Sequence, residues 1–278
     1  MLSARHRIFA AALLVALLPA GAFAWGANAH RMITNKAVDT LPPEVRGFFE
    51  SNRNFIVQRC TLPLESLAKN PGDKSSHFIY LDRYGHFPFD SLPRDYNSAV
   101  RKHGRRMIEA NGKLPWQIGY YSLQLRRAFE AHNWEEAKQM AAALAYFVAA
   151  AHDPFNTTEN YDGHLSGQPG IGQRFSSALV DRYQLFFFVR PNPAVEVSDP
   201  TDHAFDIALG AHSWIENILL ADFRARRGLS DYTDEYYDRF YNQAGAILIR
   251  QLSDASTEVG SFWLSAWIHA GRPPLPPR

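Results

Sequence analysis

The sequence predicts an all-α protein that forms one helical domain over residues 25–278. Two observations lead to this fold class. Beyond residue 25, apolar side chains recur three or four residues apart, the spacing of a buried helix face, and prolines or glycines separate these segments. In addition, no segment alternates apolar and polar residues for long enough to form a sheet, and no repeat of fixed period is present. A multi-helix bundle is therefore the expected architecture.

The first 24 residues have the three parts of a secretory signal peptide. Arg5 and Arg7 form a short positive region, and Ile8–Leu18 is almost continuously apolar. Ala22 and Ala24 place small side chains at the two positions that signal peptidase recognises. The apolar run is too short to span a bilayer, which takes about 20 residues. We therefore expect cleavage after Ala24 and export to the periplasm or the extracellular medium, with no transmembrane segment.

The mature chain is expected to run from helix to helix. Pro42 and Pro43 separate the first two helices, Asn133 provides an N-cap, and Pro154 ends the most apolar helix. The aromatic run Phe186–Phe188 is expected in the core. In chain order, the predicted helices are Asn28–Leu41, a short helix from Pro43, Arg94–Ala110, Pro115–His132, Trp134–Ala151, Ile171–Val189, Thr201–Ala225, Asp231–Leu252 and Ala255–Ala270.

Two segments lack helical periodicity. Residues 156–172 form a polar, glycine-bearing stretch, and long irregular loops inside a compact helical domain are often functional. Residues 191–200 are typical of a linker between helices. The proline-rich tail, Arg272–Arg278, is expected to be extended.

The composition of the predicted mature chain excludes some classes of function. The signal carries two of the 29 basic residues and none of the 28 acidic ones, so 27 remain against 28, a net charge of −1 with His neutral. That balance argues against a general binder of nucleic acid or of anionic membranes. The basic run at 101–106 is typical of a solvated helix face, with phosphate contacts as the alternative. Cys60 is the only cysteine, so we expect a buried thiol, with a disulfide-linked dimer as the alternative.

Several motifs follow one another in an order that is typical of one family. They are Trp25-Gly26-Ala27-Asn28-Ala29-His30 at the predicted mature start, Asp73 with Ser76–Gly85, Leu92–Tyr96, Leu114–Trp116, Thr157–Gly163 and Trp263–Pro274. In this order they resemble the zinc-dependent phospholipase C and single-strand nuclease superfamily. The match spans nearly the whole mature chain.

The resemblance implies an all-helical fold and a cleft that holds three zinc ions. In the family these ions activate a hydroxide, neutralise phosphate oxygens and stabilise the leaving oxygen of a phosphodiester. Each ion takes about four ligands, and one ion takes the amine and carbonyl of the first mature residue. Signal cleavage would therefore create a ligand. Carried over to this chain, the resemblance implies metal ligands at Trp25, His30, Asp73 and His77.

Five other ligand positions of the family are substituted in this chain. Pro154 fixes the register against the family's central helix, and Gly170-Ile171 fixes the register of the segment that follows. The residues at the five positions are Tyr146, Ala150, Asn156, Gly172 and Ser176. The change at Ala150 removes the carboxylate that bridges two metals in the family. The resemblance therefore leaves at most one zinc ion, at the partial site of the four retained residues.

Nearby acids and histidines are candidates to replace the lost ligands: His152, Asp153, Glu159, Asp162 and His164. Asp153 is the best placed of these, because it follows Ala150 by three residues, whereas His152 lies about 200° around the helix from Ala150. Asp73 and His77 are four residues apart, so they either share a helix face as ligands or form an ordinary hydrogen bond.

The pattern supports two hypotheses about function. In the first, which we favour, the chain is a non-catalytic relative that keeps the helical scaffold. Its former cleft binds a ligand such as a phosphate ester or a nucleic acid, a partner, or at most one zinc ion. In the second, the chain is a divergent metal-dependent hydrolase of phosphate esters, a nuclease or a phospholipase, with a reduced metal site. A monomer is expected in both, and the sequence identifies no partner.

Overall fold

The structure, a computed structural model, describes residues 25–276, and this part of the chain is helical with no strand. The predicted signal peptide, residues 1–24, lies outside the described residues. No helix between residues 25 and 276 is long and apolar enough to cross a membrane. The α-helices are α1 Ala27–Thr40, α2 Pro43–Ser51, α3 Arg53–Arg59, α4 Leu62–Lys69, α5 Tyr96–His103, α6 Arg105–Asn111, α7 Leu114–Glu130, α8 Trp134–Ala151, α9 Ile171–Gln173, α10 Leu179–Tyr183, α11 Pro200–His212, α12 Ile215–Arg226 and α13 Asp234–His269. The shorter helical segments are η1 Pro71–His77, η2 Leu81–Tyr84, η3 Pro154–Asn156, the π turn η4 Arg174–Ala178 and η5 Gln184–Phe186.

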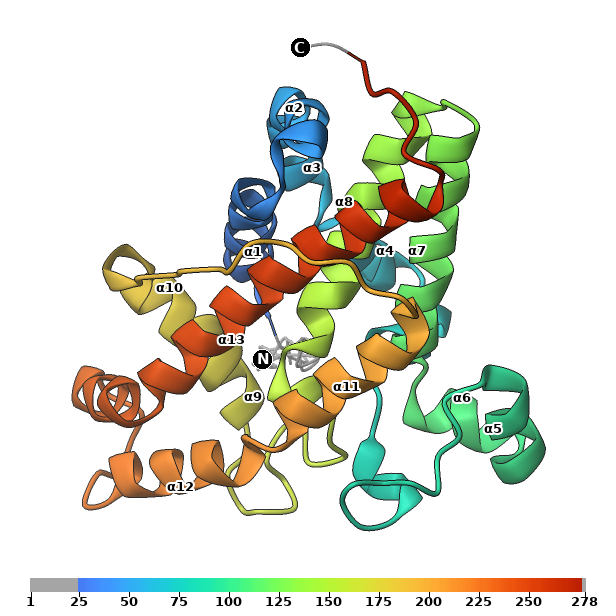
Figure 1. Ribbon diagram of the computed structural model, residues 1–278. Helices are drawn as coiled ribbons and strands as arrows, with labels where there is room; N and C mark the ends of the chain where they lie inside the picture. The colour runs from blue at the N-terminus through green and yellow to red at the C-terminus, as the bar shows by residue number, and fades with distance from the viewer. Residues whose placement is uncertain (1–24, 277–278) are drawn as a thin grey trace, which may run out of the picture.

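Helix α8 lies at the centre of the bundle, where α1, α3, α7 and α13 pack against it (Figure 1). Its C-terminal half is buried on every side, as its alanine-rich sequence allows. Asn133 caps the helix by accepting a hydrogen bond from the backbone N–H of Glu136. Trp263 of α13 donates its indole N–H to the carbonyl of Ala141 (3.0 Å) and stacks on Phe49 (4.5 Å between ring centroids). The predicted helix Trp134–Ala151 and its cap are therefore confirmed.

Two predicted helices are wrong because each is broken into two. Residues 94–110 form α5 and α6, which separate at Gly104, where φ is 82°. A positive φ ends a right-handed helix, and glycine adopts it at little cost. Residues 201–225 form α11 and α12, which separate at Ser213, whose hydroxyl donates to the carbonyl of Gly210 in a local turn.

Two other predicted helices are wrong because they form a single continuous helix. Residues 231–252 and 255–270 belong to α13, which is 36 residues long. At the expected break, the hydroxyl of Ser253 donates to the carbonyl of Ile249 (2.8 Å), a bond that a helix interior accommodates. No proline or glycine stands between Leu252 and Ala255 to end the helix.

The predicted core position of Phe186–Phe188 is also wrong. Phe186 is 74% exposed and Phe188 is 66% exposed, whereas Phe187 packs against Tyr241. The chain leaves the helix at η5, so that these rings no longer follow the spacing of one buried face. The lone Cys60, by contrast, is buried as expected, and burial raises the pKa of its thiol to about 11.

The coil of residues 187–199 crosses α13 on its way from α10 to α11 (Figure 1). Four of its backbone N–H groups donate to hydroxyls that are spaced four residues apart on α13. The pairs are Arg190 with Ser253 (3.1 Å), Asn192 with Thr257 (2.9 Å), Val195 with Ser261 (3.1 Å) and Val197 with Ser265 (2.7 Å). Each hydroxyl also donates to the carbonyl four residues earlier in α13. We call this row the hydroxyl ladder. It supplies hydrogen-bond acceptors to backbone N–H groups of a coil that forms no sheet or helix hydrogen bonds of its own.

Helices α1 and α13 approach closely at Gly260. A Cβ atom at this position would lie 1.9 Å from Oγ1 of Thr40 and 3.1 Å from the carbonyl oxygen of Ala37. Gly260→Ala is therefore expected to lower the free energy of unfolding by about 1–3 kcal/mol, measured by urea unfolding. Gly210→Ala on α11 is the matched control, because a Cβ there meets nothing within 4 Å. Equal stability of the two variants would contradict the close approach, and Thr40→Ala should restore part of the loss.

Candidate functional site

The retained histidines of the predicted metal site meet around one tyrosine of α8. His30 of α1 stacks on the ring of Tyr146, with 4.5 Å between the ring centroids. His77, at the end of η1, lies with its Nδ1 atom 2.7 Å from the phenol oxygen of Tyr146. The three side chains are each at least 95% buried. Tyr146, which the resemblance gives as a substituted ligand position, thus lies between the two histidines.

The three groups at this centre are uncharged at neutral pH. Burial lowers the pKa of His30 to about 3 and that of His77 to about 4, and it raises the pKa of Tyr146 well above its usual range. Within residues 25–276, the buried phenol of Tyr146 has one hydrogen-bond partner, which is His77. We therefore assign the phenol as the donor to Nδ1 of His77, from the hydrogen-bond network, which places the ring proton on Nε2.

Trp25 lies at the same end of α8. Its ring is 1% exposed, and its indole N–H donates to the carbonyl of Ala149 (2.9 Å). The ring also lies near Phe175 of η4, with 6.3 Å between the ring centroids. Trp25 and His30 therefore contact neighbouring turns of α8.

Asp73 differs from the other three predicted ligands, because it is exposed. Its carboxylate accepts a hydrogen bond from the hydroxyl of Ser76 (2.8 Å) rather than from His77. Asp73 and His77 nevertheless line one pocket of about 270 Å³. The charge of Asp73 acts to raise the pKa of His77, but burial outweighs it. The remaining wall of the pocket includes Arg59, Ser66, Tyr121, Gln139, Met140 and Phe147.

The substituted positions are filled in ways that leave little room for ligands. The side-chain N–H of Asn156 donates to the carbonyl of Ala150 (2.9 Å). At Gly172, a Cβ would lie 2.4 Å from the carbonyl oxygen of Tyr161, so that a histidine cannot stand there without movement of the backbone. Ala150 itself is 1% exposed and packs in the core.

Asp153, the best-placed candidate replacement, is a buried acid. One carboxylate oxygen accepts a hydrogen bond from the N–H of Phe155 (2.9 Å), and the other has no partner within residues 25–276. Burial raises the pKa of this carboxyl to about 7, although the Ser176 hydroxyl beside it acts in the opposite direction. That hydroxyl makes no hydrogen bond of good geometry in the described part of the chain. Within this range, one carboxylate oxygen of Asp153 is therefore buried without a hydrogen-bond donor.

The other candidate replacements lie elsewhere. His152 lines a pocket between α11 and α13 with His203 and Glu258. Glu159 forms an ion pair with Arg83 (3.1 Å). Asp162 and His164 pair with each other (2.8 Å) within their own loop.

The donor set fits zinc poorly. Across the described range, residues 25–276, no three His, Cys, Asp or Glu side chains come close enough together to hold a metal ion. Nδ1 of His77 is already hydrogen-bonded to the phenol of Tyr146, which leaves one ring nitrogen, Nε2, for a metal. Among the described residues, Nδ1 of His30 is buried without a hydrogen-bond partner. The group that stacks on this imidazole is the ring of Tyr146, which offers no carboxylate to share a metal ion. These residues therefore do not fit the zinc centre that the resemblance implies.

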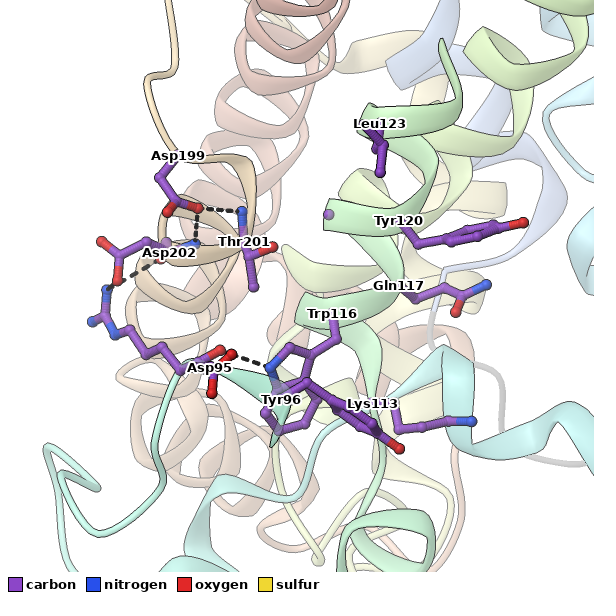
Figure 2. A pocket seen from close by; sticks show the side chains of 12 residues that line it. Asp95, Tyr96, Lys113, Trp116, Gln117, Tyr120, Leu123, Asp199, Thr201 and Asp202 are labelled. Atoms are coloured by element: carbon purple, nitrogen blue, oxygen red, sulfur yellow. Dashed lines mark hydrogen bonds and ion pairs between the residues drawn. The ribbon is translucent and has the colours of Figure 1, made fainter. Parts of the chain in front are cut away.

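Two of the family-like motifs meet at a different pocket, of about 690 Å³, between α5, α7 and α11 (Figure 2). The indole of Trp116 donates to the carbonyl of Arg94 (2.7 Å), and the guanidinium of Arg94 pairs with Asp202 (2.7 Å). Asp199 caps α11 through the N–H groups of Thr201 and Asp202. These contacts are structural. This pocket could not be predicted from the sequence, because α11 follows α5 by about a hundred residues.

Comparison with protein-family models and with curated proteins finds no match for this chain. The resemblance to the zinc-dependent phospholipase C and single-strand nuclease superfamily therefore rests on the ordered motifs of the sequence, and the structure shows the coarser expectation, an all-helical fold.

Proposed function

We propose that this chain is a non-catalytic relative of the zinc-dependent phospholipase C and single-strand nuclease superfamily, exported after cleavage behind Ala24, and that its former metal cleft binds a small phosphate ester. The observation that carries the proposal is the phenol of Tyr146, which is bonded to His77 and stacked on His30. A metal ion shared by both imidazoles would compete with this phenol for Nδ1 of His77. The hydrolytic chemistry of the superfamily needs such ions, so its loss follows.

The pocket beside His77 supports the binding half of the proposal. With Nδ1 engaged, Nε2–H is the hydrogen-bond donor that His77 offers to a ligand. The guanidinium of Arg59 adds a positive charge and a planar set of donors that suits phosphate oxygens. Met140 and Phe147 supply an apolar wall for the alcohol part of an ester.

Metal content and hydrolysis test the loss of catalysis. The chain from Trp25 onward, purified without chelator, is expected to hold no stoichiometric zinc by atomic absorption. It is also expected not to hydrolyse bis(p-nitrophenyl) phosphate when zinc is added, because Tyr146 and Ala150 stand at two ligand positions. One zinc per chain that disappears in His30→Ala, together with cleavage that disappears in Asp73→Ala, would overturn the proposal and establish the divergent hydrolase instead.

Calorimetric titration with p-nitrophenyl phosphate tests binding separately. Arg59→Met is expected to weaken the affinity about tenfold, because a charge-assisted hydrogen bond is lost. Arg182→Met, which removes an exposed arginine on α10, is the matched control and should bind as the wild type does. Absence of binding to the wild type, or equal binding by both variants, would refute the assignment of this pocket.

A further inference from the structure

Three large apolar side chains project from the turn that follows α10. Leu185 is 92% exposed, Phe186 is 74% exposed and Phe188 is 66% exposed. We call these three residues the apolar tip. The turn lies at the periphery of the molecule, beside the yellow end of α10 in Figure 1. Single exposed apolar residues are common on protein surfaces, but three within four positions on one turn are a concentrated patch.

The apolar tip is held in place from below. Tyr183 stacks on Tyr241 of α13 with 4.3 Å between the ring centroids, and Phe187 lies over the same ring at 6.0 Å. Val189 is buried, and the next N–H, that of Arg190, donates to Ser253 in the hydroxyl ladder. The segment is therefore anchored on both sides of the apolar tip, and the three side chains are exposed because the fold directs them outward.

Tyrosines and arginines surround the base of the apolar tip. The guanidinium of Arg182 lies 4.1 Å from the ring centroid of Tyr237, and that of Arg190 lies 4.0 Å from that of Phe188. The leucine and phenylalanine side chains are thus more exposed than Tyr183 and Tyr237, which are half-buried, and the two exposed guanidinium groups lie over neighbouring rings. The same order of side chains marks the hydrocarbon edge and the headgroup layer of a bilayer, where tyrosines gather and arginines extend toward phosphates.

The charges near the apolar tip do not favour an anionic surface. Arg182 is paired with Asp234 (2.6 Å), and the hydroxyl of Tyr183 donates to Asp238. Asp181, on the same helix, accepts a hydrogen bond from Asn28. With Arg190, this gives three carboxylates against two guanidinium groups, so attraction to anionic lipid is not the driving force.

We propose that the apolar tip inserts into the interface of a zwitterionic lipid bilayer and holds the protein at a membrane surface. Burial of leucine and phenylalanine side chains supplies the free energy, and Arg190, beside Phe188, is the arginine that would reach a headgroup phosphate. A protein partner fits less well, since a stable interface buries about 800 Å² on each side around a closely packed core. A projecting turn of three side chains offers far less contact to a flat protein surface.

Sedimentation with phosphatidylcholine vesicles tests the proposal. The chain from Trp25 onward is expected to sediment with the vesicles, and the binding should persist in about 0.5 M NaCl, where exposed charges are screened. The triple variant Leu185→Ser, Phe186→Ser, Phe188→Ser is expected to lose at least about tenfold in partition coefficient. Its melting temperature should be unchanged, because the three side chains are exposed in the folded state.

The double variant Leu220→Ser, Phe223→Ser is the matched control, because it removes exposed apolar side chains from α12 instead. This variant should sediment with the vesicles as the wild type does. Failure of the wild type to bind, or equal binding by the triple variant, would overturn the proposal. So would a wild-type dimer that becomes monomeric in the triple variant without lipid, since the apolar tip would then be covered by a second copy of the chain.

Discussion

Replacement of Asp222 by alanine is expected to lower the melting temperature by roughly 10 °C. The Asp222 side chain is 3% exposed and that of Arg174 is 8% exposed, and the two form an ion pair at 3.0 Å. The hydroxyl of Tyr236 and the amide of Gln168 donate to the same carboxylate. Without it, the guanidinium stays buried with no counter-charge, which typically costs about 3–5 kcal/mol.

The matched control for this experiment is Asp234→Ala, which breaks the ion pair of Arg182 at the surface. The Asp234 side chain is 88% exposed, so its loss should change the melting temperature by about 1 °C or less. Both melts can be followed by circular dichroism. Equal melting temperatures for the two variants would show that the buried pair does not stabilise the fold. The pair also holds the loop of residues 157–170, because Arg174 donates to the carbonyl of Pro169 (2.6 Å).

Mild acid is expected to destabilise the protein through its buried histidines. Burial lowers the pKa of His152 as well, and the magnitude of the effect is derived for His30 and His77. Burial lowers the pKa of His30 to about 3 and that of His77 to about 4, from an ordinary 6.5. Between those values and pH 6.5, the unfolded chain binds protons that the folded chain does not. The stabilisation is therefore complete above pH 6.5 and is lost as the pH falls. From pH 6.5 to 5 the loss is on the order of 2 kcal/mol for each histidine.

Asp153 acts in the opposite direction over the same range. Its pKa is raised from 3.8 to about 7, so the folded chain holds a proton that the unfolded chain releases, and stability falls as the pH rises. In the wild type this carboxyl offsets about half of the histidine effect. Urea unfolding of Asp153→Asn at pH 6.5 and 5 should therefore show a loss about twice that of the wild type. A variant that is equally stable at both pH values would mean that His30 and His77 are not held neutral.

The sequence predicted the helices whose ends carry local signals. Asn133 and Pro154 bracket α8, and both act over a few residues, so the ends of that helix could be placed. The break at Gly104 was missed, because a glycine between two basic pairs reveals its positive φ only in the fold. The exposure of Phe186 was missed for the opposite reason. An aromatic run favours the core in isolation, and the turn at η5 depends on packing against α13.

The sequence named residues for a metal site, and the structure shows how they are arranged without testing whether they bind a metal. Trp25, His30 and His77 do converge on the C-terminal half of α8. The resemblance gave Tyr146 as a substituted ligand position, yet the sequence could not show that its phenol would bond to His77, because that contact joins residues 69 positions apart. The contacts of Asp153 were equally beyond reach, since they depend on how η4 lies against the end of α8.

The hydroxyl ladder bears on which changes the coil can accept. Its bonds come from backbone N–H groups, so they form whatever side chain stands at the bonded position, with one exception. Proline has no N–H, and the coil carries prolines at 191 and 193, between bonded positions and not on them. The path of the coil therefore depends on the serines and threonine of α13, about sixty residues later in the sequence. The coil itself needs only to have no proline at a position whose N–H bonds to one of these hydroxyls.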